Sequence, residues 1–247
     1  MKSVRRGYVD KDEELFAGAQ RIKILSAAND ARWLMNRGYS AESAITFSSN
    51  HYLLTSRQRM AIFRSILNDD DKATRQKKEI LKPGSEVLVD GLNIIITLET
   101  ALSHSLVLRG DDGVLRDVAG LHGTYRIIDK TEKAVELILQ TLSCLGVRKA
   151  TFILDKPVSN SGSLKQLILE LSKNYNIDVD AELNMNPDLL FVDKENVISS
   201  DGPVLQRSFS WYNLNSMVIR RMIPDAWIFD FKYGNKNFEN IYSNQVH

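Results

Sequence analysis

The sequence predicts a three-layer α/β domain with a central, mainly parallel sheet, preceded by a small all-helical domain. Three observations support this prediction. Apolar residues recur at helical spacing in residues 11–68, a charge-dense stretch then ends at Pro83 and Gly84, and strand and helix patterns alternate after it. Alternation of this kind is typical of parallel β-structure. We therefore expect two domains, residues 1–83 and 84–247.

The composition is that of an ordinary globular protein, with 43% hydrophobic and 26% charged residues, which excludes a disordered or fibrous chain. No segment reaches the roughly eighteen apolar residues that cross a bilayer, and the first residues lack the apolar stretch of a signal peptide. The single cysteine, Cys144, favours a reducing compartment. We therefore expect a cytoplasmic protein with no membrane partner. Apolar sequence surroundings also predict that Cys144 and the three tryptophans pack in the interior: Trp33, Trp211 and Trp227.

Charge is distributed unevenly between the two expected domains. Residues 1–82 contain 16 Lys and Arg against 10 Asp and Glu, a net charge of +6, and the remainder contains 16 against 21, a net charge of −5. A basic region beside an acidic body suggests an anionic partner for the first and cations for the second. Net charges of this size also occur on inert surfaces.

Capping residues mark the helices of the N-terminal domain. Helical spacing predicts a first helix whose buried face includes Leu15, Ala19, Ile22 and Leu25. Gly38 ends this helix and Ser40 begins a short second one. Thr55, with Gln58 three residues later, forms a capping box that begins a third. The charge-dense residues 68–83 are expected to be a partly helical connector.

The C-terminal domain is expected to be Rossmann-like, with strands at 86–89, 150–154, 177–182, 196–199 and 226–231. Helices are expected near 94–106, 131–145, 163–174 and 210–222. Three of the strands lead into an acid: Asp90, Asp155 and Asp201. Ligands of open α/β sheets bind at the carboxyl ends of the strands, so these acids are candidate site residues.

These three acids have two readings. Each alone could cap the helix that follows it. If the three converge, carboxylates about 4 Å apart repel by several kcal/mol even at an effective dielectric near 20. A divalent cation would relieve that repulsion and use it for catalysis. We therefore predict that Asp90, Asp155 and Asp201 are catalytic and hold Mg²⁺ or Mn²⁺.

Residues 109–126 form a glycine-rich segment, in which four glycines argue against a regular helix or strand. A structured loop of this length is usually functional. Its acids could add metal ligands: Asp111, Asp112 and Asp117. Its basic residues could bind phosphate: Arg109, Arg116, His122 and Arg126. The alternative is a surface loop with scattered salt bridges.

A second candidate phosphate loop follows Asp155. The residues Ser159, Asn160, Ser161 and Gly162 precede a helix, where backbone N–H groups could cradle a phosphate. The segment is not a Walker loop, because the G-K-[ST] sequence is missing. A plain helix cap at Ser161 or Ser163 is the alternative. Asp188, in NMNPDLLF, could be a further metal ligand or the cap of a short helix.

The order of the motifs VDGLN, LDKPVSNSG and SSDGPVL resembles the PIN-like nucleases, including their NYN branch. The chain is also similar, from about residue 32 to 222, to the family catalogued as domain of unknown function 434, which joins a short helical part to a PIN-like part. That family brings no established activity with it.

The resemblance to PIN-like domains implies that Asp90, Asp155 and Asp201 hold Mg²⁺ or Mn²⁺. One further acid would complete the set: Asp112, Asp117 or Asp188. The sequence departs from the common PIN pattern, because Glu99 lies closer to the first acid than the usual second acid does, and the glycine-rich segment has no counterpart. Both departures leave the fourth ligand open.

The function these expectations favour is a metal-dependent nuclease acting on single-stranded or structured RNA. One metal would activate water and the other would stabilise the leaving oxygen. The residues expected to contact phosphate or RNA also include Asn93, of VDGLN, and Lys156, and the basic N-terminal domain would hold the strand. A non-catalytic RNA- or nucleotide-binding module is the alternative, and an N-terminal DNA-binding helix-turn-helix using Ser56, Arg57 and Arg59 is a weaker one. A homodimer is left open.

Overall fold

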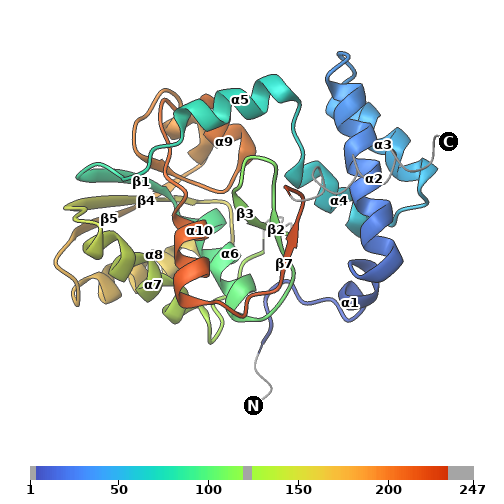
Figure 1. Cartoon of the computed structure of the whole chain (residues 1–247). Coiled ribbons are helices and arrows are strands. Elements are labelled where there is room, and N and C mark those ends of the chain that lie inside the picture. The colour runs from blue at the N-terminus through green and yellow to red at the C-terminus, as the bar shows by residue number, and fades with distance from the viewer. Residues whose placement is uncertain (1–3, 119–123, 233–247) are drawn as a thin grey trace.

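The computed structural model describes residues 4–118 and 124–232 of the chain. Five helices come first (Figure 1): α1 Asp12–Leu15, α2 Gly18–Met35, α3 Ala41–His51, α4 Ser56–Ser65 and α5 Asp69–Lys78. The predicted caps are confirmed, because the Ser40 side chain accepts a hydrogen bond from the Ser43 backbone and Thr55 and Gln58 form a capping box. The connector is helical over most of its length, as α5.

Helix α2 buries a face of small residues that includes Ala27, Ala28 and Ala31, and α3 packs against the helix. Ile22 is 60% exposed, Trp33 is 55% exposed and Ala19 is also exposed, so these three predictions of burial are wrong. Apolar residues surround α2 on several sides, so their spacing alone does not determine which face is buried. Within the described residues, no helix combines the length and the apolar character that crossing a membrane requires.

The main sheet has four parallel strands in the order β5-β4-β1-β6. Their bounds are β1 Glu86–Asp90, β4 Lys149–Asp155, β5 Asp178–Asn184 and β6 Val197–Ile198. The first four predicted strands are these four, which confirms an α/β domain with a parallel sheet.

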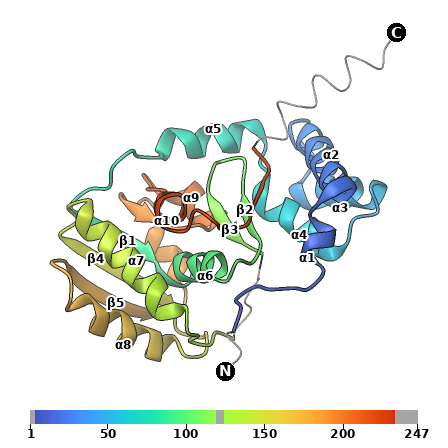
Figure 2. The same ribbon diagram turned by 60° about the horizontal axis from the view of Figure 1, so that its bottom comes forward.

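Helices cover both faces of this sheet, so the domain has three layers (Figures 1 and 2). One face carries α6 Gly91–Leu102, α7 Thr131–Cys144, α8 Ser161–Ser172 and α10 Leu214–Met222, and the other carries α9 Gly202–Arg207 and the 3-10 helix η1 Pro187–Phe191. Side chains alternate accordingly, since Val87 and Val89 pack with the first group and Leu88 with the second.

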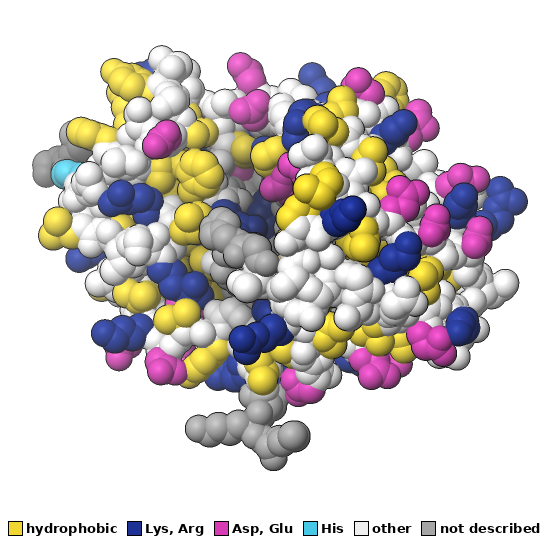
Figure 3. Space-filling model, turned by 180° about the vertical axis from the view of Figure 1, so that it is seen from behind, with side chains coloured by type: hydrophobic (Ala, Val, Ile, Leu, Met, Phe, Trp, Pro, Cys, Tyr) yellow, Lys and Arg dark blue, Asp and Glu magenta, His cyan; other side chains and the backbone are white. Residues whose placement is uncertain are grey.

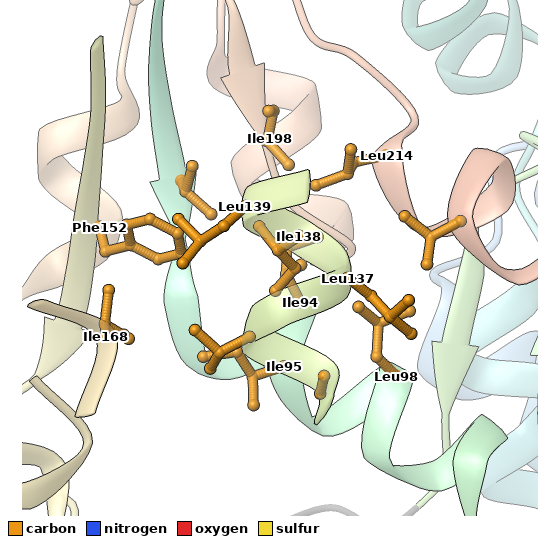
Figure 4. Packing of buried hydrophobic residues seen from close by; sticks show 14 of the residues in the cluster. Ile94, Ile95, Leu98, Leu137, Ile138, Leu139, Phe152, Ile168, Ile198 and Leu214 are labelled. Carbon is orange, nitrogen blue, oxygen red and sulfur yellow. The ribbon is translucent and has the colours of Figure 1, made fainter. Parts of the chain in front are cut away.

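The core between the sheet and the larger helical layer is apolar and closely packed. Figure 4 shows Phe152 of β4 and Ile198 of β6 against side chains of α6 and α7, such as Ile138. Burying one side chain of this kind stabilises the fold by about 1.5–3 kcal/mol. Cys144, at the end of α7, is exposed, so its predicted burial is wrong.

A second, three-stranded sheet lies beside the first, in the order β3-β2-β7. It consists of β2 Val107–Arg109, β3 Leu115–Asp117 and β7 Ile228–Asp230, with β2 and β3 antiparallel. The glycine-rich segment was expected to contain no regular strand, and the structure corrects this. Gly113, with φ +81°, lies in the turn of a hairpin, so this glycine permits strand pairing.

The N-terminal helices pack against this second sheet. Phe16 and Ile24 share one apolar cluster with Leu108 and Phe229, and Phe16 meets the Phe229 ring edge-on at 5.4 Å between centroids. Ion pairs also cross the expected domain boundary, as between Arg32 and Asp111 at 2.8 Å. The helical region and the α/β body therefore share a core.

Candidate functional site

The order of the strands points to a candidate ligand site at the carboxyl ends of the strands, beside β1 and β6. We call this end of the sheet the edge. The chain passes from β1 through β4 to β5 in one direction, and β6 then returns to the other side of β1. Ligand crevices of open α/β sheets lie at such a switch point, outside the carboxyl ends of the strands. Asp90 ends β1, Asp155 ends β4, and Asp201 follows β6. The structure therefore places all three predicted acids at this edge.

Asp90 is the most deeply buried of the three, with 4% exposure. Its Oδ2 accepts hydrogen bonds from Ser199 Oγ at 2.6 Å and from Asn93 Nδ2 at 2.8 Å. Burial, and after it the charges of Asp201 and Asp155, raise the pKa of Asp90 to about 7 against these hydrogen bonds. Asn93, predicted to contact phosphate, orients Asp90 through its hydrogen bond.

Ser199 links Asp90 to Asp201, because its Oγ also accepts a hydrogen bond from the Asp201 backbone N–H at 2.9 Å. Asp201 Oδ2 accepts from the Val204 N–H at 3.3 Å and so caps α9. The helix-cap alternative is thus correct for this residue. Burial raises the pKa of Asp201, as does the charge of Asp188.

Asp155 is half-buried, and burial raises its pKa, followed by the charges of Asp188 and Asp201. Asp188 lies in η1 with its side chain 54% exposed, 3.6 Å from Arg207. The negative charge of Asp188 acts on both Asp155 and Asp201. Asp188, one of the candidates for the fourth metal ligand, therefore lies near the edge.

Asp112 does not belong to this edge. Arg116 Nη1 donates to its Oδ1 at 2.8 Å, and Arg75 Nη1 donates to its Oδ2 at 2.9 Å. Burial alone would raise the pKa of Asp112, but the two guanidinium groups outweigh burial and lower the pKa to about 2. The prediction of Asp112 as a metal ligand is corrected, because both of its oxygens already bind arginine.

Arg116 is likewise occupied, at 3% exposure. Besides Asp112, its Nε donates to the carbonyl oxygen of Ser200 at 2.7 Å. Arg116 therefore fixes the backbone just before Asp201. It is not available to phosphate, so the prediction that it binds phosphate is corrected.

Asp117 ends β3, and a basic residue that the sequence did not indicate lies with it. Arg64 of α4 approaches Asp117 Oδ1 with its Nη1 at 3.5 Å, and its charge also lowers the pKa of Asp201. The local sequence offers no signal for this role, because Arg64 reaches the site only through the packing of the N-terminal helices.

The predicted phosphate loop after Asp155 is largely a structural anchor. Ser159 Oγ accepts from the Tyr125 N–H at 3.0 Å, and Asn160 Nδ2 donates to the Tyr125 carbonyl at 2.7 Å. Ser161 is buried at the start of α8, and an added Cβ at Gly162 would meet no atom within 4 Å. Lys156 and Arg126 are exposed, and His122 lies outside the described residues.

Two further residues lie away from the edge. Arg109 pairs with Asp230 at 2.9 Å in the second sheet. Glu99 is fully buried and binds Arg6 and Tyr125, so its position in the sequence reflects a structural role.

The carboxylate oxygens at the edge are possible ligands of a cation, but they do not form a complete coordination shell. In the described part of the chain, no three His, Cys, Asp or Glu side chains are arranged to hold a metal ion. Mg²⁺ commonly takes only one or two carboxylates and completes its shell with water and substrate phosphate. The carboxyl groups of Asp90, Asp155 and Asp201 are hard oxygen donors of the kind that such an ion takes, and burial together with neighbouring carboxylates raises the pKa of each.

Comparison with known proteins places two families along the chain. The family described as Domain of unknown function (DUF5616) matches residues 80–217, and the one described as Protein of unknown function (DUF434) matches residues 23–78. The resemblance to the second family is thus confirmed for the N-terminal helices, whereas a different family matches the α/β body. The uncharacterized protein MJ0935 of Methanocaldococcus jannaschii is 33% identical over 188 residues, which cover 75% of this chain and 90% of that protein. No solved structure matches the chain.

Proposed function

The chain belongs to the family described as Domain of unknown function (DUF5616), and we propose that this member is a metal-dependent nuclease that hydrolyses phosphodiester bonds of RNA. One observation carries the proposal. Asp90, Asp155 and Asp201 lie together at the switch point of the sheet, and no Lys, Arg or His among the described residues forms an ion pair with any of them. Buried acids are normally paired, and an unpaired group points to a bound cation.

The proposal includes a PIN-like assignment for the α/β body. Its support is the parallel order β5-β4-β1-β6 with acids at the carboxyl ends of β1 and β4 and after β6. The motifs that resemble PIN-like nucleases contain these acids: VDGLN, LDKPVSNSG and SSDGPVL.

The residues at the edge would have different roles in the proposed reaction. Asp90, Asp155 and Asp201 would hold Mg²⁺ or Mn²⁺, with Asp188 or Asp117 as a further acid. The ion supplies a Lewis acid for the phosphoryl oxygen and lowers the pKa of bound water. Ser199 positions two of the acids through its hydrogen bonds to Asp90 and to the Asp201 backbone. Arg64 and the exposed Lys156 offset phosphate charge.

RNA is proposed as the substrate class because the N-terminal region has a net charge of +6, from 16 basic and 10 acidic residues in 1–82. Figure 3 shows the face opposite to that in Figure 1, where the surface is hollowed between the N-terminal helices and the α/β body and Lys and Arg side chains line the hollow.

The test is cleavage of a labelled RNA oligonucleotide by the purified protein with Mn²⁺ or Mg²⁺. We expect EDTA to stop cleavage and Asp90→Asn to remove it, because asparagine keeps the shape of the side chain and removes its charge. Asp178→Asn is the matched control, since Asp178 is exposed at the opposite end of the same sheet. Equal cleavage by the Asp90→Asn variant and the wild type would refute the assignment.

A second candidate is a non-catalytic module that binds RNA or a nucleotide. It is favoured by the lack of a three-ligand metal group in the described residues and by the capping of α9 by Asp201. This candidate predicts RNA binding that neither EDTA nor Asp90→Asn alters, and no cleavage by the wild type.

A further inference from the structure

A cleft of about 700 Å³ lies away from the three acids, between α5, the turn of the β2–β3 hairpin and α10. None of Asp90, Asp155 and Asp201 lines it. Its volume is that of a small-molecule site, which typically measures about 300–1,000 Å³. The cleft is therefore large enough for a nucleotide or for part of a nucleic-acid strand.

Four basic side chains line this cleft: Arg109, Arg220, Arg221 and Lys232. Only Arg109 is neutralised, by Asp230 at 2.9 Å, and the other three form no ion pair with any acid of the described residues. Arg220 and Arg221 act on the same wall, because the charges of both oppose the rise that burial causes in the pKa of Tyr212.

The acids of the cleft do not cancel this positive charge. Asp112 is already neutralised by Arg75 and Arg116. Glu79 is half-buried, and burial raises its pKa while the charge of Lys232 opposes this rise, so one carboxyl group faces three basic side chains without an ion pair. The lining is therefore left with an excess of cations that face a common space.

The remaining walls offer apolar and polar contacts side by side. Ile80, Tyr212 and Met217 supply apolar surface. Asn213 and Ser216 both donate to the Gly113 carbonyl, so they join α10 to the hairpin and fix the width of the cleft. Cations beside an aliphatic and aromatic wall suit a phosphate attached to a nucleobase.

We propose that this cleft binds a phosphate-bearing ligand, either a free nucleotide or a segment of RNA, through Arg220, Arg221 and Lys232. Arg109 lines the same cleft with its charge neutralised by Asp230. The proposal does not depend on nuclease activity, because none of the strand-end acids takes part.

The test is isothermal titration calorimetry in EDTA with three probes: inorganic phosphate, adenosine monophosphate and a single-stranded RNA decamer. We expect the wild type to bind at least one of them and the double variant Arg220→Ala/Arg221→Ala to bind it at least tenfold more weakly. Glu79→Gln should bind it several-fold more tightly, because an opposing charge is removed. Arg148→Ala is the matched control, as Arg148 is an exposed arginine outside the cleft.

The probes also distinguish the two sources of phosphate. If the mononucleotide binds, the ligand is a free nucleotide. If only the decamer binds, the ligand is an RNA strand, and the double variant should lower the slope of log K against log salt by about 1.4, from roughly 0.7 per lost cation. Arg220→Lys/Arg221→Lys should restore most of the binding, which separates lost charge from misfolding.

Three results would overturn the proposal: no probe binding at millimolar concentration, equal binding by the double alanine variant and the wild type, or an equal loss in Arg148→Ala. Asp90→Asn should bind the probe as the wild type does. A failure of the nuclease proposal would therefore leave this result unchanged.

Discussion

Two groups of three aspartates in this protein look alike in the sequence and differ in the structure. The hairpin group consists of Asp111, Asp112 and Asp117, and arginines stand against each of them. The strand-end group consists of Asp90, Asp155 and Asp201, and no described cation forms an ion pair with it.

The two groups of aspartates differ in the pKa values of their carboxyl groups. Arginine lowers the pKa of Asp112 to about 2 in spite of burial, whereas burial raises the pKa of Asp90 to about 7. Acids of the first kind hold the hairpin, the helices and the Asp201 loop together. The strand-end acids destabilise the free protein, because they are buried without a basic partner. Destabilising acids of this kind are typical of a functional site.

The largest effect on stability is expected at the hairpin group. Asp112→Asn leaves the buried Arg75 and Arg116 without a compensating charge, which should lower the free energy of unfolding by about 3–5 kcal/mol. Urea unfolding measures this change, and Asp178→Asn, at an exposed position, should stay within about 0.5 kcal/mol of the wild type. A loss below about 1 kcal/mol at Asp112 would show that the arginines are not structural partners.

The opposite sign is expected at Asp90. The folded protein binds the Asp90 proton more tightly than the unfolded chain, since the pKa rises from 3.8 to about 7. Asp90 therefore has no effect on stability below about pH 4, and it destabilises the fold increasingly up to about pH 7, by an amount on the order of 4 kcal/mol at most.

Asp90→Asn removes this penalty, so the variant should gain stability relative to the wild type as the pH rises from 5 to 8. Urea unfolding in EDTA at both pH values measures the gain. Parallel pH profiles for the two proteins would mean that Asp90 is not held at a raised pKa.

A smaller effect is expected at Arg64, which pairs with Asp117 and whose charge also acts on Asp201. Arg64→Ala should change the free energy of unfolding by no more than about 1 kcal/mol, because the contact with Asp117 is 3.5 Å long and the Arg64 side chain is 24% exposed. RNA affinity in EDTA should fall roughly fivefold through loss of a phosphate contact. Arg37→Ala, at an exposed arginine stacked on Trp33, is the control, and an equal loss there would remove the special role of Arg64.

The sequence was sufficient to predict the parallel sheet and the positions of the acids that follow its strands. A buried strand and the first polar residue after it are local features, so Asp90 and Asp155 could be placed at strand ends. Caps such as Thr55 with Gln58 are local too.

The partners of the acids could not be predicted, because they come from distant parts of the chain. Asp112 is bound by Arg75, and the backbone before Asp201 is fixed by Arg116 through Ser200. The glycines of the hairpin were misinterpreted for a related reason, since strand pairing of β2 with β7 joins segments more than 100 residues apart. The exposure of Trp33 likewise depends on which face of α2 receives α3.

Thermal unfolding with increasing Mn²⁺ at pH 7.5 shows whether the strand-end acids form a cation site. A cation at about 100 times its dissociation constant should stabilise the wild type by about 2.7 kcal/mol, a rise of roughly 5–10 °C in Tm for a chain of this size. Asp90→Asn should begin with a higher Tm in EDTA and gain little from Mn²⁺, so the two titration curves converge or cross. If Mn²⁺ at millimolar concentration leaves the wild-type Tm unchanged, the acids do not form a metal site.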